Sequence, residues 1–223
     1  MNNQDTINVI MAKQHEYKIF ADRIISYINH NPILSKNVHS FKFRTKDLEH
    51  LDEKISRKNK ELEAKGEELI SPDNVQKKIT DIAGIRILHL HQGQLETIHE
   101  TFMSYVQERD VFLYEKPKAY TWDPEYAELF ESLGMVVEQK ESFYTSVHYV
   151  FKASENSDVT CELQVRTLFE EVWGELDHTV NYPLETESLL IKEQLKVFAR
   201  IVGAGTRMSH SIFKMIDGET MQK

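Results

Sequence analysis

The segment Val159-Thr-Cys-Glu-Leu-Gln-Val-Arg166 decides how this chain folds. Apolar and polar residues alternate along it with a period of two, which predicts a strand with one face in the core and one face free. The polar row carries an acid, an amide and a guanidinium, in Glu162, Gln164 and Arg166. Taken alone, such a row fits a solvated sheet face and a ligand site equally well.

The preceding segment, Phe143-Tyr-Thr-Ser-Val-His-Tyr-Val-Phe151, favours the ligand site. Residues 152–158 between the two segments are polar and turn-rich, which predicts a hairpin. In that register the even-numbered residues of both strands share one face, with His148 opposite Gln164. The residues that join the polar row are Tyr144, Ser146 and His148. Polar and aromatic groups that converge in this way are typical of a binding site.

The rest of the chain predicts helices around a small sheet. We expect an α+β fold with a mixed sheet of about five strands, flanking helices, and helical arms at both ends. Residues 109–133 are irregular and predict a long loop with one short helix near Pro124. The other expected helices are 4–30, 47–66, 75–82, 94–107, 167–180 and 186–202, the last resuming to 216 beyond two glycines, and the other expected strands are 37–44, 84–90 and 134–139.

Composition limits the class of protein. The chain has 223 residues, a formal net charge of −9 and a single cysteine, Cys161, on the apolar row of the strand. One cysteine excludes an internal disulfide framework and fits a reducing cytoplasm. No apolar run approaches membrane-spanning length, and the N-terminus lacks a signal-peptide pattern. The acidic balance excludes a generic nucleic-acid binder, so any polyanion must meet a local basic patch.

Such a patch is predicted on the helix at 47–66. Its basic residues fall at i, i+4, i+8, i+11 and i+12, which places them on one helical face, with Arg44 just upstream. In so acidic a chain, this concentration of cations favours a triphosphate site. The basic residues are Lys46, His50, Lys54, Arg57 and Lys58.

An acid at a turn adds a candidate metal ligand. In Asp81-Ile-Ala-Gly-Ile-Arg86, Asp81 lies where a short helix ends and a strand begins. Asp81 and Glu162 could hold Mg²⁺ together, because this ion takes one or two carboxylates and completes its shell with phosphate oxygens and water. A capping role for Asp81 remains the alternative.

Three ordered motifs resemble the synthetase domain of the RelA/SpoT family. They are Lys78-Ile-Thr-Asp-Ile-Ala-Gly-Ile-Arg86, Lys140-Glu-Ser-Phe-Tyr-Thr-Ser-Val-His148 and Glu162-Leu-Gln-Val-Arg-Thr167. The resemblance implies a stand-alone small alarmone synthetase with a nucleotidyltransferase-like fold. It places an N-terminal helical arm at 1–35, the pyrophosphokinase domain at 36–183 and a C-terminal helical arm at 184–223.

The resemblance also implies a reaction and a role for each site residue. The β,γ-pyrophosphate of ATP moves to the 3′-hydroxyl of GDP or GTP, giving (p)ppGpp and AMP, with Mg²⁺ as cofactor. Asp81 and Glu162 would be catalytic and hold the metal. The residues that would bind ATP are Arg44, Lys46, Lys54, Arg57 and Arg86, and those that would bind the acceptor are Lys140, Tyr144, Ser146, His148 and Gln164.

One departure leaves the acceptor open. The family's usual Gly-Tyr-Arg-Ser is Phe143-Tyr-Thr-Ser146 here. One alternative is a toxin-type relative that pyrophosphorylates the 3′ CCA end of tRNA and has an antitoxin protein as partner. A second alternative is a non-catalytic nucleotide-binding regulator, which the presence of both acids disfavours. The apolar stripes of the terminal helices allow a homo-oligomer.

Overall fold

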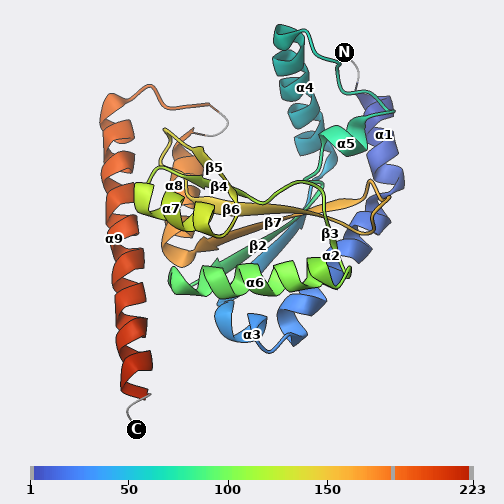
Figure 1. The fold of residues 1–223 in the computed structure, drawn as a ribbon. Coiled ribbons are helices and arrows are strands. Elements are labelled where there is room, and N and C mark those ends of the chain that lie inside the picture. The colour runs from blue at the N-terminus through green and yellow to red at the C-terminus, as the bar shows by residue number, and fades with distance from the viewer. Residues whose placement is uncertain (1–2, 182–183, 221–223) are drawn as a thin grey trace.

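The computed structural model describes residues 3–181 and 184–220 (Figure 1). The boundary expected at 183 lies outside these residues. The helices are α1 (Gln4–Ala12), α2 (Gln14–His30), α3 (Leu34–Asn37), α4 (Leu48–Lys65), α5 (Val75–Lys78), α6 (Gly93–Gln107), α7 (Pro124–Ser132), α8 (Leu168–Asn181) and α9 (Leu189–Thr220). The strands are β1 (Ser40–Thr45), β2 (Ala83–His89), β3 (Phe112–Leu113), β4 (Lys118–Thr121), β5 (Val136–Gln139), β6 (Ser146–Lys152) and β7 (Thr160–Thr167).

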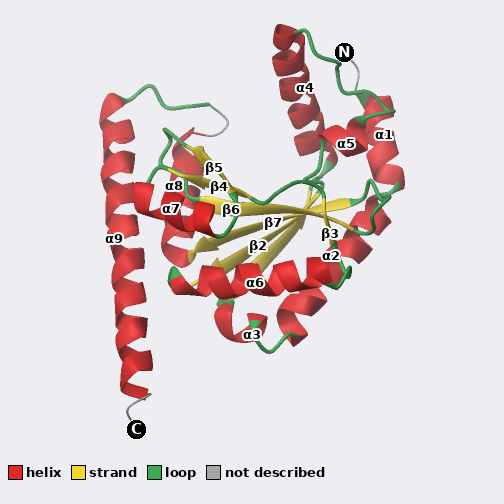
Figure 2. Cartoon of the chain, in the orientation of Figure 1, coloured by secondary structure: helices red, strands yellow, loops and turns green. Residues whose placement is uncertain are grey.

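The strands of this described part form one mixed sheet, which Figure 2 shows in yellow among the helices. Their order is β1-β2-β7-β6-β4-β5, with β3 paired to β6. β2 runs parallel to β7 and β4 to β5, whereas the other neighbours are antiparallel. The predicted α+β class is confirmed, but the sheet has seven strands where about five are expected.

The main core lies on the side of the sheet that the odd-numbered residues of β2, β6 and β7 face. Ile85, Tyr149 and Leu163 are fully buried there with Tyr17 of α2 and Phe102 of α6. In Figure 1, α6 lies along the sheet. Because side chains alternate along a strand, the even-numbered residues face the other way and are available for a site.

Helix α8 begins directly at the end of β7, as predicted. The Thr167 amide donates to the Glu170 carboxylate at 2.7 Å, and the Glu170 amide donates to the Thr167 hydroxyl at 3.2 Å. This reciprocal pair is a capping box, which satisfies two amides at the start of the helix. The first turn of α8 is thereby fixed beside the polar end of β7.

The C-terminal helix differs from the prediction. The glycines at 203 and 205 do not interrupt it, and α9 runs without a break from Leu189 to Thr220. A Cβ atom at Gly205 would lie 2.8 Å from the Phe169 ring of α8. The glycine therefore allows α8 and α9 to approach closely and does not break the helix.

Two further predictions are wrong. The single helix expected over 4–30 is interrupted at Lys13, where the backbone leaves helical geometry between α1 and α2. The irregular stretch 109–133 contains β3 and β4 besides the expected short helix α7. β4 has four residues, which are too few to show an alternation of apolar and polar residues in the sequence. Its position in the sheet is set by its pairing with β6.

Among the described residues, the structure contains no helix with an apolar stretch long enough to cross a membrane.

Candidate active site

The even-numbered residues of the central strands form a polar face. His148 of β6 lies opposite Gln164 of β7, as the hairpin prediction requires. Parallel pairing with β2 then places Arg86 beside Gln164 and Gly84 beside Glu162. The polar row of the deciding segment therefore lies in the middle of the sheet, flanked by side chains from both neighbouring strands.

Two adjoining cavities open over this face. The first, of about 190 Å³, is lined by residues that include Asp81 and Glu162. The second, of about 410 Å³, extends toward Tyr144 and helix α8. The residues that line both are Arg44, Arg86 and Gln164. The cavities therefore form one continuous site with an acidic end and an aromatic end.

Glu162 is held by two neighbours on the polar face. His148 Nδ1 lies 3.1 Å from its Oε1, and the Gln164 amide donates to its Oε2 at 2.9 Å. Burial raises the pKa of the Glu162 carboxyl, but the hydrogen bond and charge of His148 outweigh burial, so the pKa lies below its ordinary value of 4.5. Glu162 is therefore ionised at neutral pH and oriented by its partners.

Asp81 lies in the connection between α5 and β2, against two lysines. Lys46 Nζ is 3.2 Å from its Oδ2, and Lys54 of α4 bonds to the same oxygen. Burial raises the pKa of this carboxyl, but the two ammonium groups outweigh burial and hold the pKa below 3.8. Its other oxygen, Oδ1, is buried and has no hydrogen-bond partner among the described residues. A buried oxygen of this kind is suited to a cation or a donor from a ligand.

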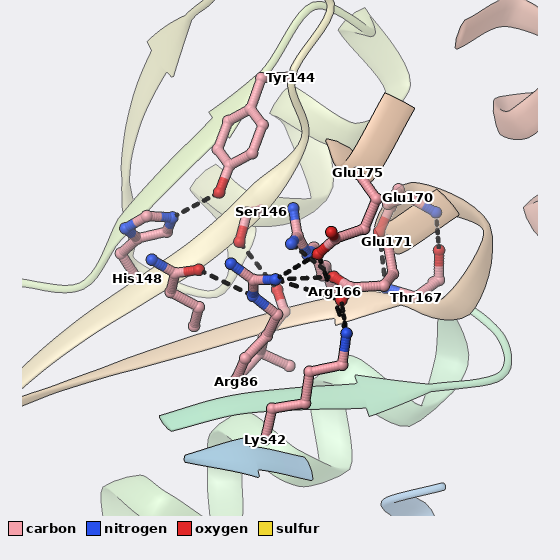
Figure 3. A network of polar contacts seen from close by, with 12 residues as sticks. Lys42, Arg86, Tyr144, Ser146, His148, Arg166, Thr167, Glu170, Glu171 and Glu175 are labelled. Carbon is pink, nitrogen blue, oxygen red and sulfur yellow. Dashed lines mark hydrogen bonds and ion pairs between the residues drawn. The ribbon is translucent and has the colours of Figure 1, made fainter. Parts of the chain in front are cut away.

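A carboxylate on α8 gathers cations from three neighbouring strands (Figure 3). Glu171 lies 2.8 Å from Lys42, 3.1 Å from Arg86 and 2.5 Å from Arg166. Burial raises the pKa of Glu171, but these three cations lower it to about 2. Arg86 also bonds to Glu175 at 3.1 Å. Its Nε donates to Gln164 Oε1 at 3.3 Å. The guanidinium of Arg86 is thus held through two of its nitrogens.

The aromatic end of the site is built on Tyr144. Its hydroxyl lies 3.1 Å from His148 Nε2 (Figure 3). Because His148 Nδ1 contacts Glu162, the side chains of Tyr144, His148 and Glu162 form a chain. Burial raises the pKa of the Tyr144 phenol, which therefore stays protonated beside the imidazole. The guanidinium carbon of Arg166 lies 5.9 Å from the Tyr144 ring centroid.

The structure gathers most of the residues that the sequence singles out. Those that line the cavities are Arg44, Asp81, Arg86, Tyr144, Glu162 and Gln164, and Lys46, Lys54 and His148 bond to the two acids. Ser146 is buried, and its hydroxyl donates to the Val165 carbonyl at 3.5 Å. Arg57 is exposed on α4 and is not among the described residues that line either cavity. The role assigned to each residue stays a prediction.

Sequence reasoning missed two contributors to the site. Glu171 follows the strand motif on a helix, and only tertiary packing brings it onto the cations. Tyr120 of β4 lies against His148 with a centroid separation of 4.8 Å, and Lys140 Nζ lies 4.5 Å from the Tyr120 ring centroid. Recognising β4 as a neighbour of β6 would have predicted Tyr120, because Tyr120 pairs with Ser146.

Comparison with known proteins identifies the family. The model described as "Region found in RelA / SpoT proteins" matches residues 43–187, well over half of the chain. The chain therefore belongs to the RelA/SpoT family, as its motifs predict. A curated relative, GTP pyrophosphokinase YwaC of Bacillus subtilis (strain 168), is 26% identical over 197 residues, which cover 85% of this chain and 78% of the relative.

Solved structures share the fold. A GTP pyrophosphokinase family protein from Streptococcus pneumoniae superposes with a TM-score of 0.61 at 17% identity, covering 97% of this chain and 93% of that protein. Small alarmone synthetase 1 from Bacillus subtilis, bound to its product pppGpp, gives 0.59 at 21% identity, with 98% of each chain covered. The fold of this chain is thus that of small alarmone synthetases.

Proposed function

We propose that this protein is a Mg²⁺-dependent pyrophosphokinase that transfers the β,γ-pyrophosphate of ATP to the 3′-hydroxyl of GDP or GTP. The observation that carries the proposal is the polar face itself, where Asp81 and Glu162 line one cavity that also has cations along its wall. Family membership and the GTP pyrophosphokinase relative support the reaction class.

The donor nucleotide fits the first cavity. Arg44 and Arg86 come from adjacent strands and are offset by two residues in the pairing register. Diagonal neighbours on one sheet face lie roughly 7–8 Å apart, about twice the 3.5 Å contact distance of two stacked planes. The two side chains thus leave the sheet at a spacing that would admit a flat adenine ring between their guanidinium groups. The ATP phosphates would then extend toward Lys46 and Lys54.

The acid pair fits a magnesium ion. Asp81 offers the buried oxygen Oδ1, which has no partner in the part of the chain that the structure describes, and Glu162 offers a second ionised carboxylate at the same cavity. Asp81 and Glu162 would hold Mg²⁺, which would supply positive charge against the ATP phosphates. Lys46 and Lys54, which pair with Asp81 in the free protein, are within reach to exchange that carboxylate for ATP phosphates.

The transfer itself is a displacement at phosphorus. The acceptor 3′-oxygen forms a bond to the β-phosphorus of ATP, and the bond from that phosphorus to the α,β-bridging oxygen breaks, which releases AMP. The ionised Glu162 accepts the proton of the 3′-hydroxyl, and His148 holds the carboxylate in place. Such a reaction depends on positioning and charge neutralisation more than on covalent catalysis.

Transfer of label tests the proposal and identifies the acceptor. The purified protein is incubated with [γ-³²P]ATP, Mg²⁺ and GDP, GTP or bulk tRNA in separate reactions. We expect label on GDP or GTP. Label on tRNA alone would overturn the proposed acceptor and establish the toxin-type alternative, and absence of label on every acceptor would favour a binding-only regulator.

A further inference from the structure

Phe143, immediately before Tyr144, has an unusual backbone conformation. Its φ is 63°, in the left-handed region. A side chain with a Cβ atom is disfavoured there, and a bulky one especially so, because Cβ crowds the backbone. Strain of this kind persists only where the surroundings enforce it, and it concentrates at functional sites.

Contacts from two directions hold the Phe143 ring. The ring lies 4.9 Å from Trp122, between centroids, and the guanidinium carbon of Arg200 on α9 lies 5.4 Å from its centroid. It also packs on the small apolar cluster formed by Trp173, Ala199 and Val202 of α8 and α9. The C-terminal helix and the end of β4 therefore enforce the strained conformation together.

The conformation of Phe143 determines where Tyr144 points. The Phe143 amide donates to the Lys140 carbonyl at 3.3 Å, which closes a turn directly before the strand. From there Tyr144 reaches His148, and His148 reaches Glu162. A change of φ at residue 143 would rotate the turn and move the Tyr144 ring relative to this chain.

We propose that Phe143 is a positioning residue for the acceptor. Packing of its ring against Trp122 and α9 holds the left-handed turn, and the turn aims Tyr144 into the second cavity. The C-terminal helix thereby contributes to acceptor binding without touching the acceptor. This inference rests on the proposed function and adds a determinant of acceptor affinity that lies outside the polar face.

Two substitutions at one position separate positioning from direct contact. Phe143→Ala and Phe143→Gly remove the same ring, but only alanine keeps the Cβ atom that disfavours a positive φ. We expect Phe143→Ala to raise the KM for the acceptor about tenfold while the KM for ATP stays within twofold. Phe143→Gly retains the turn, so its acceptor KM stays within about threefold. If Phe143→Ala does not fold, Phe143→Leu is measured in its place.

Arg109 supplies the matched control. It has a φ of 64° and pairs with Glu155 on the exposed surface. Arg109→Ala and Arg109→Gly make the same comparison, with and without a Cβ atom, at the turn after α6. We expect neither variant to change the KM for the acceptor or the KM for ATP.

The outcomes separate this inference from the proposed function. Equal increases in acceptor KM for Phe143→Ala and Phe143→Gly would mean that the ring contacts the acceptor directly, and equal changes in both KM values would mean a general structural role. Either result overturns the inference. If no acceptor is labelled, the proposed function fails, but amide hydrogen exchange still tests the turn. Corrected for intrinsic rates, exchange at residue 143 should accelerate about tenfold in Phe143→Ala and little in Phe143→Gly, and equal rates would refute positioning.

Discussion

Replacing Glu171 with glutamine should destabilise the protein far more than an ordinary surface substitution. The Glu171 side chain is 8% exposed, and its partner Arg166 is 3% exposed. The Nε atom of Arg166 already lacks a hydrogen-bond partner within residues 3–181 and 184–220. Loss of the carboxylate charge leaves a buried guanidinium without its counter-ion. Breaking a buried ion pair in this way costs about 3–5 kcal/mol.

The pKa of Glu171 gives a similar magnitude. A fall from 4.5 to about 2 on folding corresponds to about 3 kcal/mol of stability at pH 7. The pKa is lower in the folded state, so this stability is present above pH 4.5 and is lost as the pH falls toward 2. At pH 3 about 1 kcal/mol remains, because the unfolded carboxyl is then protonated while most of the folded one is not.

Thermal and urea unfolding of Glu171→Gln measure the effect. For a chain of this length, about 3 kcal/mol lowers Tm by roughly 6–12 °C. Glu175→Gln is the matched control, since Glu175 also bonds to Arg86 but its side chain is 56% exposed; such a pair contributes about 1 kcal/mol or less. Equal Tm values for the two variants, or a deficit of Glu171→Gln that does not shrink between pH 7 and pH 3, would refute the reasoning.

Two further predictions concern the surroundings of the acids. Gly174→Ala should lower the free energy of unfolding by about 1–3 kcal/mol, because its Cβ would lie 2.6 Å from Nη1 of the tethered Arg166. Gly218→Ala is the control, because a Cβ atom there would meet no described atom within 4 Å. Equal urea midpoints for the two variants would contradict the clash. Lys54→Met should raise the pKa of Asp81, since Lys54 lowers it in the folded protein, and should move the acid limb of the kcat/KM profile to higher pH. An unmoved limb would show that Asp81 does not control activity.

The hairpin was predictable because the alternation of apolar and polar residues along each strand fixes which residues of the two strands lie opposite each other. Once Glu162, Gln164 and Arg166 are placed on one face, the parity of the neighbouring strand follows, and His148 lies opposite Gln164 as expected. The residues that line the first cavity were predictable from motifs, because Asp81 and Arg86 belong to one short segment of the sequence. Both kinds of information are local in the sequence.

The missing parts depend on tertiary packing. Glu171 receives three cations from three strands, and no spacing within α8 indicates those partners. Tyr120 lies on a strand too short to show a pattern. Phe143 marks a departure from the family motif in the sequence, but only its φ shows that the position still has the geometry that glycine favours.

The product of ATP cleavage tests the central claim most directly. Pyrophosphoryl transfer releases AMP, whereas phosphoryl transfer would release ADP. With GDP or GTP and Mg²⁺ present, the wild-type protein should form AMP in equal amount to the pyrophosphorylated acceptor. Asp81→Asn and Glu162→Gln, confirmed as folded by circular dichroism, should lower that rate at least about a hundredfold. Formation of ADP, or AMP at an unchanged rate in both variants, would contradict the proposal that these two acids catalyse the transfer.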